Sequence, residues 1–281
     1  MILVTGATGT IGREVVRRLP SDLPVRIMAR EPARVTGASG TADIVRGDYA
    51  DPASLERALS GVRAVFLVTT RVGEDDGPII RTARSAGVRH VVKLSAAAVE
   101  DPGATDLITR WQRVNEELLC GSGMEWTLLR PRSFMSNTLS WAASIREEGV
   151  VRALWGTSAN ACVDPGDVAE VAVRALTEHG HAGRAHTLTG PEAITAVEQT
   201  ARLSEVLGRR IRFEELSPEQ ARSGLGRRYP EPVVEALLES ARRQREGAKA
   251  QVETTVLDVT GRPATPFGTW AQGQRGAFAG A

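Results

Sequence analysis

Short apolar runs alternate with helical patterns of hydrophobic residues through the first half of the chain. After the first apolar run, Ile11, Val15 and Leu19 recur at the spacing of a buried helix face. Asp51 followed by Pro52 is typical of a helix start, because Asp caps free amides and Pro suits the first turn. The alternation predicts a doubly wound α/β fold, with a parallel sheet covered on both faces. The expected strands are 2–5, 25–29, 43–45, 64–68, 90–94 and 126–130, with later helices at about 78–86 and 104–120.

The second half of the chain has a less regular pattern. A helix is expected over about 164–176, and the spacing of Thr195 and Glu198 predicts a capping box at the start of another. Ser217 is expected to begin a further helix. Residues 224–232, rich in Gly, Arg and Pro, are expected to form a surface loop.

Composition places the chain among ordinary globular proteins, with 42% hydrophobic and 25% charged residues. The formal charge of +1 provides no broad attraction for nucleic acid or an anionic membrane, and no apolar run is long enough to span a bilayer. Two cysteines cannot build a disulfide scaffold, so a cytoplasmic location is expected. His179, His181 and His186 lack nearby carboxylate or thiol ligands, so they are expected to be exposed loop residues, and no metal site is predicted.

A glycine-rich turn joins the first strand to the first helix. Gly6 permits a tight turn, Gly9 lets the backbone approach a phosphate, and Gly12 lets the helix pack against the strand. The amides of Thr10 and Ile11 at the helix start are expected to bind a pyrophosphate. Thr8 lies in the same turn. The alternative is a glycine turn without a ligand.

The second expected strand ends at Ala29-Arg30, where NAD-specific proteins usually have an acid. A guanidinium at this place suits the 2′-phosphate of NADP, so NADP(H) is the predicted cofactor, although Arg30 could also be a solvated loop residue. Further polar or strand-terminal residues are expected along the dinucleotide, unless loop polarity alone explains them. These are Asp48, Tyr49, Thr69, Thr70, Ser95 and Pro131.

Motifs along nearly the whole chain resemble those of the NmrA-like atypical short-chain dehydrogenase/reductases. They are GATG at 6–9, AR at 29–30, GD at 47–48, LSA at 94–96, GMEWTLLRP at 123–131, FMSN at 134–137, DPGDVA at 164–169, LTGPE at 188–192, LSEVLGR at 203–209 and VTGRP at 259–263. The resemblance implies a Rossmann core with a small C-terminal α/β substrate region, and it extends to the NADPH-dependent quinone reductases. The expected domains are 1–152, which binds NAD(P), and 153–281, of which about 160–180 contributes to the core and the rest covers the substrate.

Members of the wider family use a Tyr-x-x-x-Lys pair for proton transfer. Neither Tyr49 nor Tyr229 has a Lys four residues later, and Gln112 and Glu116 take the corresponding places on the helix before strand 126–130. Gln cannot deliver a proton. The chemistry that remains is hydride transfer to acceptors whose product anion is delocalised, such as quinones or conjugated enones.

Candidate catalytic and substrate-binding residues follow the later strands. Gln112 and Ser95 are the catalytic candidates, although Ser95 could equally cap a loop. After strand 126–130, an apolar group could bind a flat conjugated substrate or simply pack the interior. Lys93, inside a strand, is expected to be packed rather than catalytic. The substrate candidates are Phe134, Met135, Asn137 and Trp141.

The sequence therefore predicts an NADPH-dependent oxidoreductase that reduces a small conjugated carbonyl compound, either quinone-like or biosynthetic. A non-enzymatic NADP(H) sensor is one alternative, because the proton-transfer pair is missing. A redox-neutral isomerase or cyclase that retains the fold is another. The expected partner is a small-molecule substrate, and the sequence leaves a homodimer open.

Overall fold

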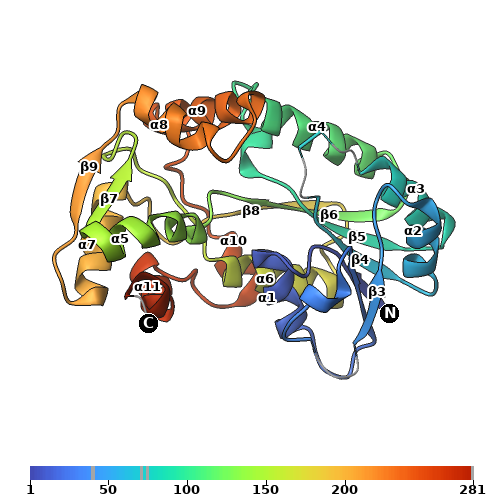
Figure 1. Ribbon diagram of the computed structural model, residues 1–281. Coiled ribbons are helices and arrows are strands. Elements are labelled where there is room, and N and C mark those ends of the chain that lie inside the picture. The colour runs from blue at the N-terminus through green and yellow to red at the C-terminus, as the bar shows by residue number, and fades with distance from the viewer. Residues whose placement is uncertain (39–41, 70–71, 74–75, 280–281) are drawn as a thin grey trace. The chain divides into compact units, whose positions relative to one another are not determined.

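The computed structural model describes residues 1–38, 42–69, 72–73 and 76–279, which divide into two compact units (Figure 1). Within these ranges, no helix combines the length and apolar character needed to cross a membrane. The first unit comprises residues 1–99, 109–131 and 165–187, and the second comprises 100–108, 132–164 and 188–281.

A seven-stranded sheet, counted over the described residues, forms the centre of the first unit in the order β3-β2-β1-β4-β5-β6-β8. Strands β1 to β6 pair in parallel, and Val4 of β1 lies between Ile27 of β2 and Phe66 of β4. The strand order changes direction at β1, and ligands bind at the carboxyl ends of the strands at such a point. The predicted Rossmann-type fold is confirmed. The strands are β1 (Ile2–Val4), β2 (Val25–Ala29), β3 (Asp43–Arg46), β4 (Ala64–Leu67), β5 (His90–Leu94), β6 (Glu125–Pro131) and β8 (Arg184–Leu188).

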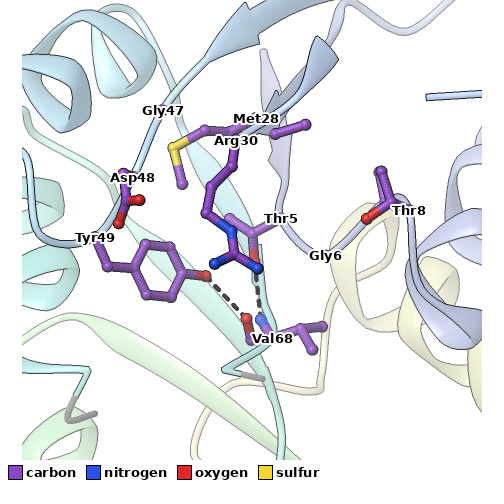
Figure 2. A pocket seen from close by; sticks show the side chains of 11 residues that line it. Thr5, Gly6, Thr8, Met28, Arg30, Gly47, Asp48, Tyr49 and Val68 are labelled. Atoms are coloured by element: carbon purple, nitrogen blue, oxygen red, sulfur yellow. Dashed lines mark hydrogen bonds between the residues drawn. The ribbon is translucent and has the colours of Figure 1, made fainter. Parts of the chain in front are cut away.

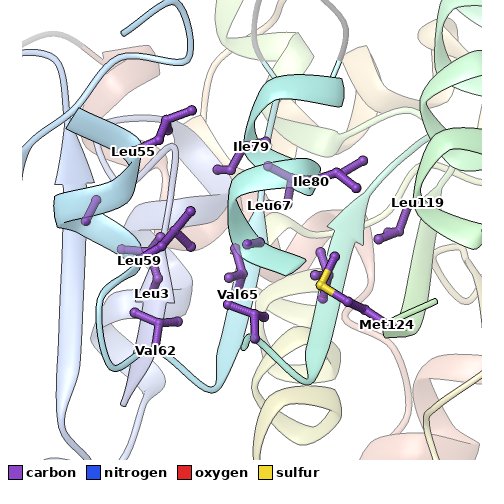
Figure 3. Close-up of a cluster of buried hydrophobic side chains, with 14 of the residues drawn as sticks. Leu3, Leu55, Leu59, Val62, Val65, Leu67, Ile79, Ile80, Leu119 and Met124 are labelled. Carbon is purple, nitrogen blue, oxygen red and sulfur yellow. The ribbon is translucent and has the colours of Figure 1, made fainter. Parts of the chain in front are cut away.

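Helices cover both faces of this sheet (Figure 1). On one face, α2, α3 and α4 bury a cluster of aliphatic side chains that includes Leu3, Leu59, Leu67, Ile79 and Leu119 (Figure 3). Full burial of each such side chain stabilises the fold by roughly 1.5–3 kcal/mol. On the other face, α1 packs against α6. The helices are α1 (Thr10–Arg18), α2 (Pro52–Leu59), α3 (Gly77–Ser85), α4 (Leu107–Cys120) and α6 (Pro165–Thr177), with short 3-10 turns η1 (Pro32–Arg34) and η2 (Ala97–Glu100).

The second unit has its own core, built around an aromatic group. The ring centroids of Phe267 and Trp270 lie 5.6 Å apart, and those of Trp270 and Phe278 lie 6.3 Å apart. A two-stranded parallel sheet, β7 with β9, packs in the same unit. The elements are η3 (Met135–Trp141), α5 (Ala142–Glu148), β7 (Val150–Ala153), α7 (Ala196–Leu207), β9 (Arg212–Glu215), α8 (Pro218–Gly226), α9 (Glu231–Arg245), α10 (Thr255–Thr260), α11 (Phe267–Gly273) and α12 (Arg275–Ala279).

The expected surface loop at 224–232 is largely wrong. Helix α8 continues through Gly226, and α9 begins at Glu231, so only four residues connect the two helices. Pro230 precedes α9 and Pro232 lies in its first turn, where a missing N–H is tolerated. The predicted capping box at Thr195 is present, and Ser217, the expected start of a further helix, forms a second capping box.

Candidate cofactor-binding site

The turn after β1 has the backbone geometry that the glycine pattern predicts. Gly6 has a φ of +65°, in the left-handed region that favours glycine, and the N–H of Gly9 donates to the carbonyl of Gly6 at 2.9 Å. Gly9 precedes α1 without a side-chain cap. The first N–H groups of a helix have no partner within the helix, so those of Thr10 and Ile11 suit an anion.

The glycines of this turn leave no room for larger residues. A Cβ added to Gly12 would lie 2.3 Å from the carbonyl oxygen of Gly6, and one added to Gly6 would lie 2.9 Å from Cβ of Val68. A Cβ on Gly9 would meet the same Gly6 oxygen at 3.2 Å. The close approach of α1 to β1 therefore depends on Gly12. The turn fits a dinucleotide pyrophosphate, because Thr8, Gly9 and Thr10 are exposed beyond the end of β1.

A pocket opens beside this turn, at the carboxyl ends of β1, β2, β3 and β4 (Figure 2). Its wall is fixed by hydrogen bonds. The Tyr49 hydroxyl donates to the carbonyl of Val68 at 2.9 Å, and Thr5 Oγ1 accepts from the N–H of Val68 at 2.9 Å. A Cβ on Gly47 would lie 2.5 Å from Cγ of Met28, so the chain after β3 passes directly against that side chain. The lining residues are Thr5, Gly6, Ala7, Thr8, Met28, Ala29, Arg30, Gly47, Asp48, Tyr49 and Val68.

Arg30 reaches across this pocket in Figure 2, between Tyr49 and the glycine turn. A second hollow shares Arg30, Gly47 and Asp48 with the pocket and adds Arg46 and Arg57. None of the three guanidinium groups forms an ion pair within the described part of the chain. Asp48 lies here as well, but its carboxylate accepts from the N–H of Ala50 at 3.1 Å. The hollow therefore presents more positive than negative charge.

Thr69 contributes to a buried network rather than to an open wall. Its hydroxyl hydrogen-bonds the carboxylate of Asp76, whose other oxygen lies 2.5 Å from Nζ of Lys93. Both charged side chains are 0% exposed, and the N–H of Asp76 donates to Oδ1 of Asn115 at 2.9 Å. Lys93 is thus packed, as predicted, but as half of an ion pair. The predicted cofactor residue Thr70 lies outside the described residues.

Ser95 and Glu116 belong to a second buried polar group. The Ser95 hydroxyl donates to Glu116 Oε1 at 2.6 Å, and Arg130 binds both carboxylate oxygens, at 3.0 and 2.6 Å. Because its proton is committed to Glu116, Ser95 can serve a ligand only as an acceptor. Gln112 on the same helix is 8% exposed, and its Oε1 has no hydrogen-bond partner among the described residues. Pro131 is buried at the end of β6.

The substrate candidates after β6 have different environments in the second unit. Met135 is 1% exposed and packs in the core, an arrangement that favours the packing alternative. Trp141 is partly buried against the same core, and Phe134 pairs with Val163 in an isolated bridge. Asn137 is exposed. Phe134, Trp141 and Asn137 therefore retain surface that a ligand can reach.

The expectation of exposed loop histidines is wrong for His186. This residue lies on β8, is 8% exposed, and its Nε2 lies 3.1 Å from Nδ1 of His181. Burial lowers the pKa of His186 to about 4, so the ring is neutral near pH 7. The sequence pattern did not indicate β8, and the burial of His186 was missed with it.

Comparisons with known proteins identify the family of the chain. A family model described as NAD(P)H-binding matches residues 6–179. A (4-alkanoyl-5-oxo-2,5-dihydrofuran-3-yl)methyl phosphate reductase from Streptomyces griseus is 59% identical over 280 residues, covering 99% of both chains. The NAD(P)H azoreductase of Xenophilus azovorans is 38% identical over 288 residues, covering 100% of both chains. The structure of an NADPH-dependent quinone oxidoreductase from Escherichia coli, complexed with NADPH, has a TM-score of 0.85 at 26% identity, covering 98% of this chain and 100% of that one.

These relatives are named as reductases, so the comparisons support an enzyme over a non-enzymatic sensor. The resemblance to NmrA-like reductases and the predicted nicotinamide cofactor are confirmed. The chain belongs to the NAD(P)H-binding family and is an NAD(P)H-dependent reductase.

Proposed function

We propose that this chain uses NADPH to reduce the ring double bond of a (4-alkanoyl-5-oxo-2,5-dihydrofuran-3-yl)methyl phosphate. The 59% identity over 99% of both chains to a reductase named for that compound is the observation that carries the proposal. The proposal narrows the expected acceptor class, because this substrate is a small conjugated carbonyl compound. The proposal also implies that the enzyme recognises the phosphate group of this substrate.

The cofactor preference is proposed from the charges beside the pocket. The amides of Thr10 and Ile11 would hold the pyrophosphate, and Arg30 with Arg46 would hold the 2′-phosphate that distinguishes NADPH from NADH. A guanidinium binds a phosphate through charge-assisted hydrogen bonds. Tyr49, held by the carbonyl of Val68, would form one wall of the adenosine site.

The reaction needs no strong acid from the protein. NADPH, when bound, supplies a hydride. In the proposed substrate, the double bond joins ring carbons 3 and 4 and is conjugated with the ring carbonyl and the alkanoyl carbonyl. A new C–H bond at carbon 3 moves the electron pair of the double bond to carbon 4, where both carbonyl oxygens share the charge. Water then protonates carbon 4.

The side chains at the expected catalytic positions suit this chemistry. Gln112 is neutral and can donate a hydrogen bond to a carbonyl oxygen, but it cannot release a proton. Ser95 is held by Glu116 and can orient a ligand donor. Glu116, clamped by Arg130, keeps the Ser95 hydroxyl in place. The missing Tyr-x-x-x-Lys pair would therefore matter for simple ketones and not for this acceptor.

Steady-state kinetics with NADPH test the proposal. The rate of NADPH oxidation should be higher, as kcat/KM, with the dihydrofuranone phosphate than with quinones or azo dyes. The product should gain two hydrogens and retain its phosphate. Tight NADPH binding without oxidation in the presence of the dihydrofuranone phosphate would reject this substrate, and a faster reaction with quinones would reassign the chain to the quinone reductases.

A further inference from the structure

The chain has only two lysines, and their environments differ. Lys93 has a carboxylate partner, Asp76, at 2.5 Å. Lys249 has none within the described residues, and its ammonium group donates to the hydroxyl of Ser240 at 2.8 Å. Its side chain is half-buried all the same. A buried ammonium group without a counter-ion is unfavourable, so this position needs an explanation.

Arg132 is a second cation close to Lys249 in the same unit. Its Nη1 donates to the carbonyl of Ala248, the residue before Lys249, at 3.3 Å. Its Nε is buried and has no hydrogen-bond partner among the described residues. Nor does Arg132 form an ion pair in the part of the chain that the structure describes. Two cations therefore lie close together, and each has N–H groups that donate no hydrogen bond to the described residues.

The pKa of Lys249 reflects the proximity of Arg132. Burial, and after it the Arg132 guanidinium, lower the pKa of Lys249 to about 8, while Asp106 acts in the opposite direction. Burial also lowers the pKa of Arg132, against the attraction of Glu100, Glu253 and Asp101.

None of the acids that act on this pair forms an ion pair with it among the described residues. Asp101 is bound by Arg243, and Glu100 is exposed. Neither Arg132 nor Lys249 is within ion-pair distance of a described carboxylate. A ligand that brings negative charge would relieve the repulsion between the two cations.

We infer that Arg132 and Lys249 form a binding site for a phosphomonoester dianion, the phosphate group of the proposed substrate. The planar fork of a guanidinium and the point charge of an ammonium group are complementary ligands for a phosphate. Arg132 also follows Pro131, the last residue of β6, and ligands bind beyond the carboxyl ends of parallel strands. The inference rests on the proposed function, and it would explain how the enzyme selects a phosphorylated acceptor.

Paired substrates test the site. The dihydrofuranone phosphate and its dephosphorylated alcohol carry the same reducible double bond, so the ratio of their kcat/KM values measures recognition of the phosphate. Lys249→Met and Arg132→Gln should each lower this ratio by about ten- to a hundredfold, mainly through a higher KM for the phosphate. Lys249→Arg should restore most of the ratio. Arg228→Gln, which removes an exposed guanidinium elsewhere in the second unit, is the matched control and should leave it unchanged.

Calorimetry with phenyl phosphate and inorganic phosphate separates this inference from the proposed function. If the wild-type protein reduces neither substrate, the proposed function fails, and loss of phenyl phosphate binding in Lys249→Met still supports the site. An unchanged kcat/KM ratio in both neutral variants overturns the assignment to the substrate. A third outcome is that inorganic phosphate binds as tightly as phenyl phosphate while the phosphorylated substrate is reduced no faster than the alcohol. That outcome assigns the pair to free phosphate. If the Lys249 and Arg132 variants bind NADPH more weakly, the pair binds a phosphate of the cofactor, and the inference is again overturned.

Discussion

Replacing Lys249 with methionine should make the protein more stable near neutral pH while it weakens recognition of the phosphate. The reason is that the half-buried ammonium group carries its charge without a carboxylate partner among the described residues, next to the Arg132 guanidinium. A ligand-binding residue often lowers stability in this way, because its charge is useful only when the ligand is present. Methionine has a similar length and no charge to desolvate.

The magnitude follows from the pKa of Lys249, which falls from 10.5 to about 8 on folding. At about 1.4 kcal/mol per pKa unit, the protonated lysine lowers the free energy of unfolding by about 3–4 kcal/mol. Loss of the hydrogen bond to Ser240 offsets about 1 kcal/mol. Lys249→Met should therefore raise the free energy of unfolding by about 2–3 kcal/mol near pH 7.

The stability gained by Lys249→Met decreases with rising pH in a defined window. Below pH 8 the lysine is protonated in both the folded and the unfolded state, so the full penalty is present. Between about pH 8 and 10.5 the folded protein loses the proton first, and the stability of the wild type rises toward that of the variant. The difference between the two proteins should therefore shrink with rising pH.

Urea unfolding of both proteins, near pH 7 and near pH 10, measures this difference directly. Lys249→Arg is the control that keeps the charge, and it should show no gain in stability. Phenyl phosphate should raise the unfolding midpoint of the wild type and not that of the methionine variant. A methionine variant that is less stable than the wild type near pH 7 would refute the reasoning.

Three further predictions concern the first unit. Arg30→Gln should weaken NADPH binding by about ten- to a hundredfold and leave NADH binding unchanged, whereas Arg34→Gln should affect neither, because Arg34 is paired with Glu31. Gly12→Ala should abolish binding of both cofactors, since its Cβ would lie 2.3 Å from the Gly6 carbonyl oxygen and force the turn apart. Asp76→Ala should destabilise the fold by about 3–5 kcal/mol, and joint replacement of Asp76 by Leu and Lys93 by Met should cost much less.

Each of these predictions has its own measurement. Fluorescence titration compares the two cofactors, and equal losses of NADPH and NADH in the Arg30 variant would remove its phosphate role. Gly224→Ala is the matched control for Gly12→Ala, because nothing lies within 4 Å of a Cβ at Gly224. Urea unfolding compares the Asp76 variants, and a double variant as unstable as Asp76→Ala would show that the carboxylate has a role besides neutralising the lysine.

The first half of the fold could be predicted because its signals are local. Each strand from β1 to β6 is a short apolar run, and the glycines at 6, 9 and 12 mark a turn whose geometry excludes other residues. The carboxyl ends of neighbouring parallel strands then place Arg30, Asp48 and Tyr49 together without knowledge of the rest of the chain.

The parts that sequence reasoning missed depend on contacts between distant residues. Asp76 lies far from Lys93 in the chain, although a lysine inside a buried strand was a signal that a carboxylate had to be nearby. Strands β7 and β9 are short and only partly apolar, and each is stabilised by the other. The sequence did not mark Lys249 as a binding residue, apart from the rarity of lysine in this chain. Its proposed role depends on the proximity of Arg132, which lies more than a hundred residues earlier.

The most direct test of the account follows one hydrogen atom. NADPH carrying deuterium at the transferable position of its nicotinamide ring is incubated with the enzyme and the dihydrofuranone phosphate, and the product is examined by NMR. The account predicts one deuterium on ring carbon 3, one solvent hydrogen on carbon 4, and an intact phosphate ester. Deuterium on a carbinol carbon of the alkanoyl group, or none in the product, would contradict it.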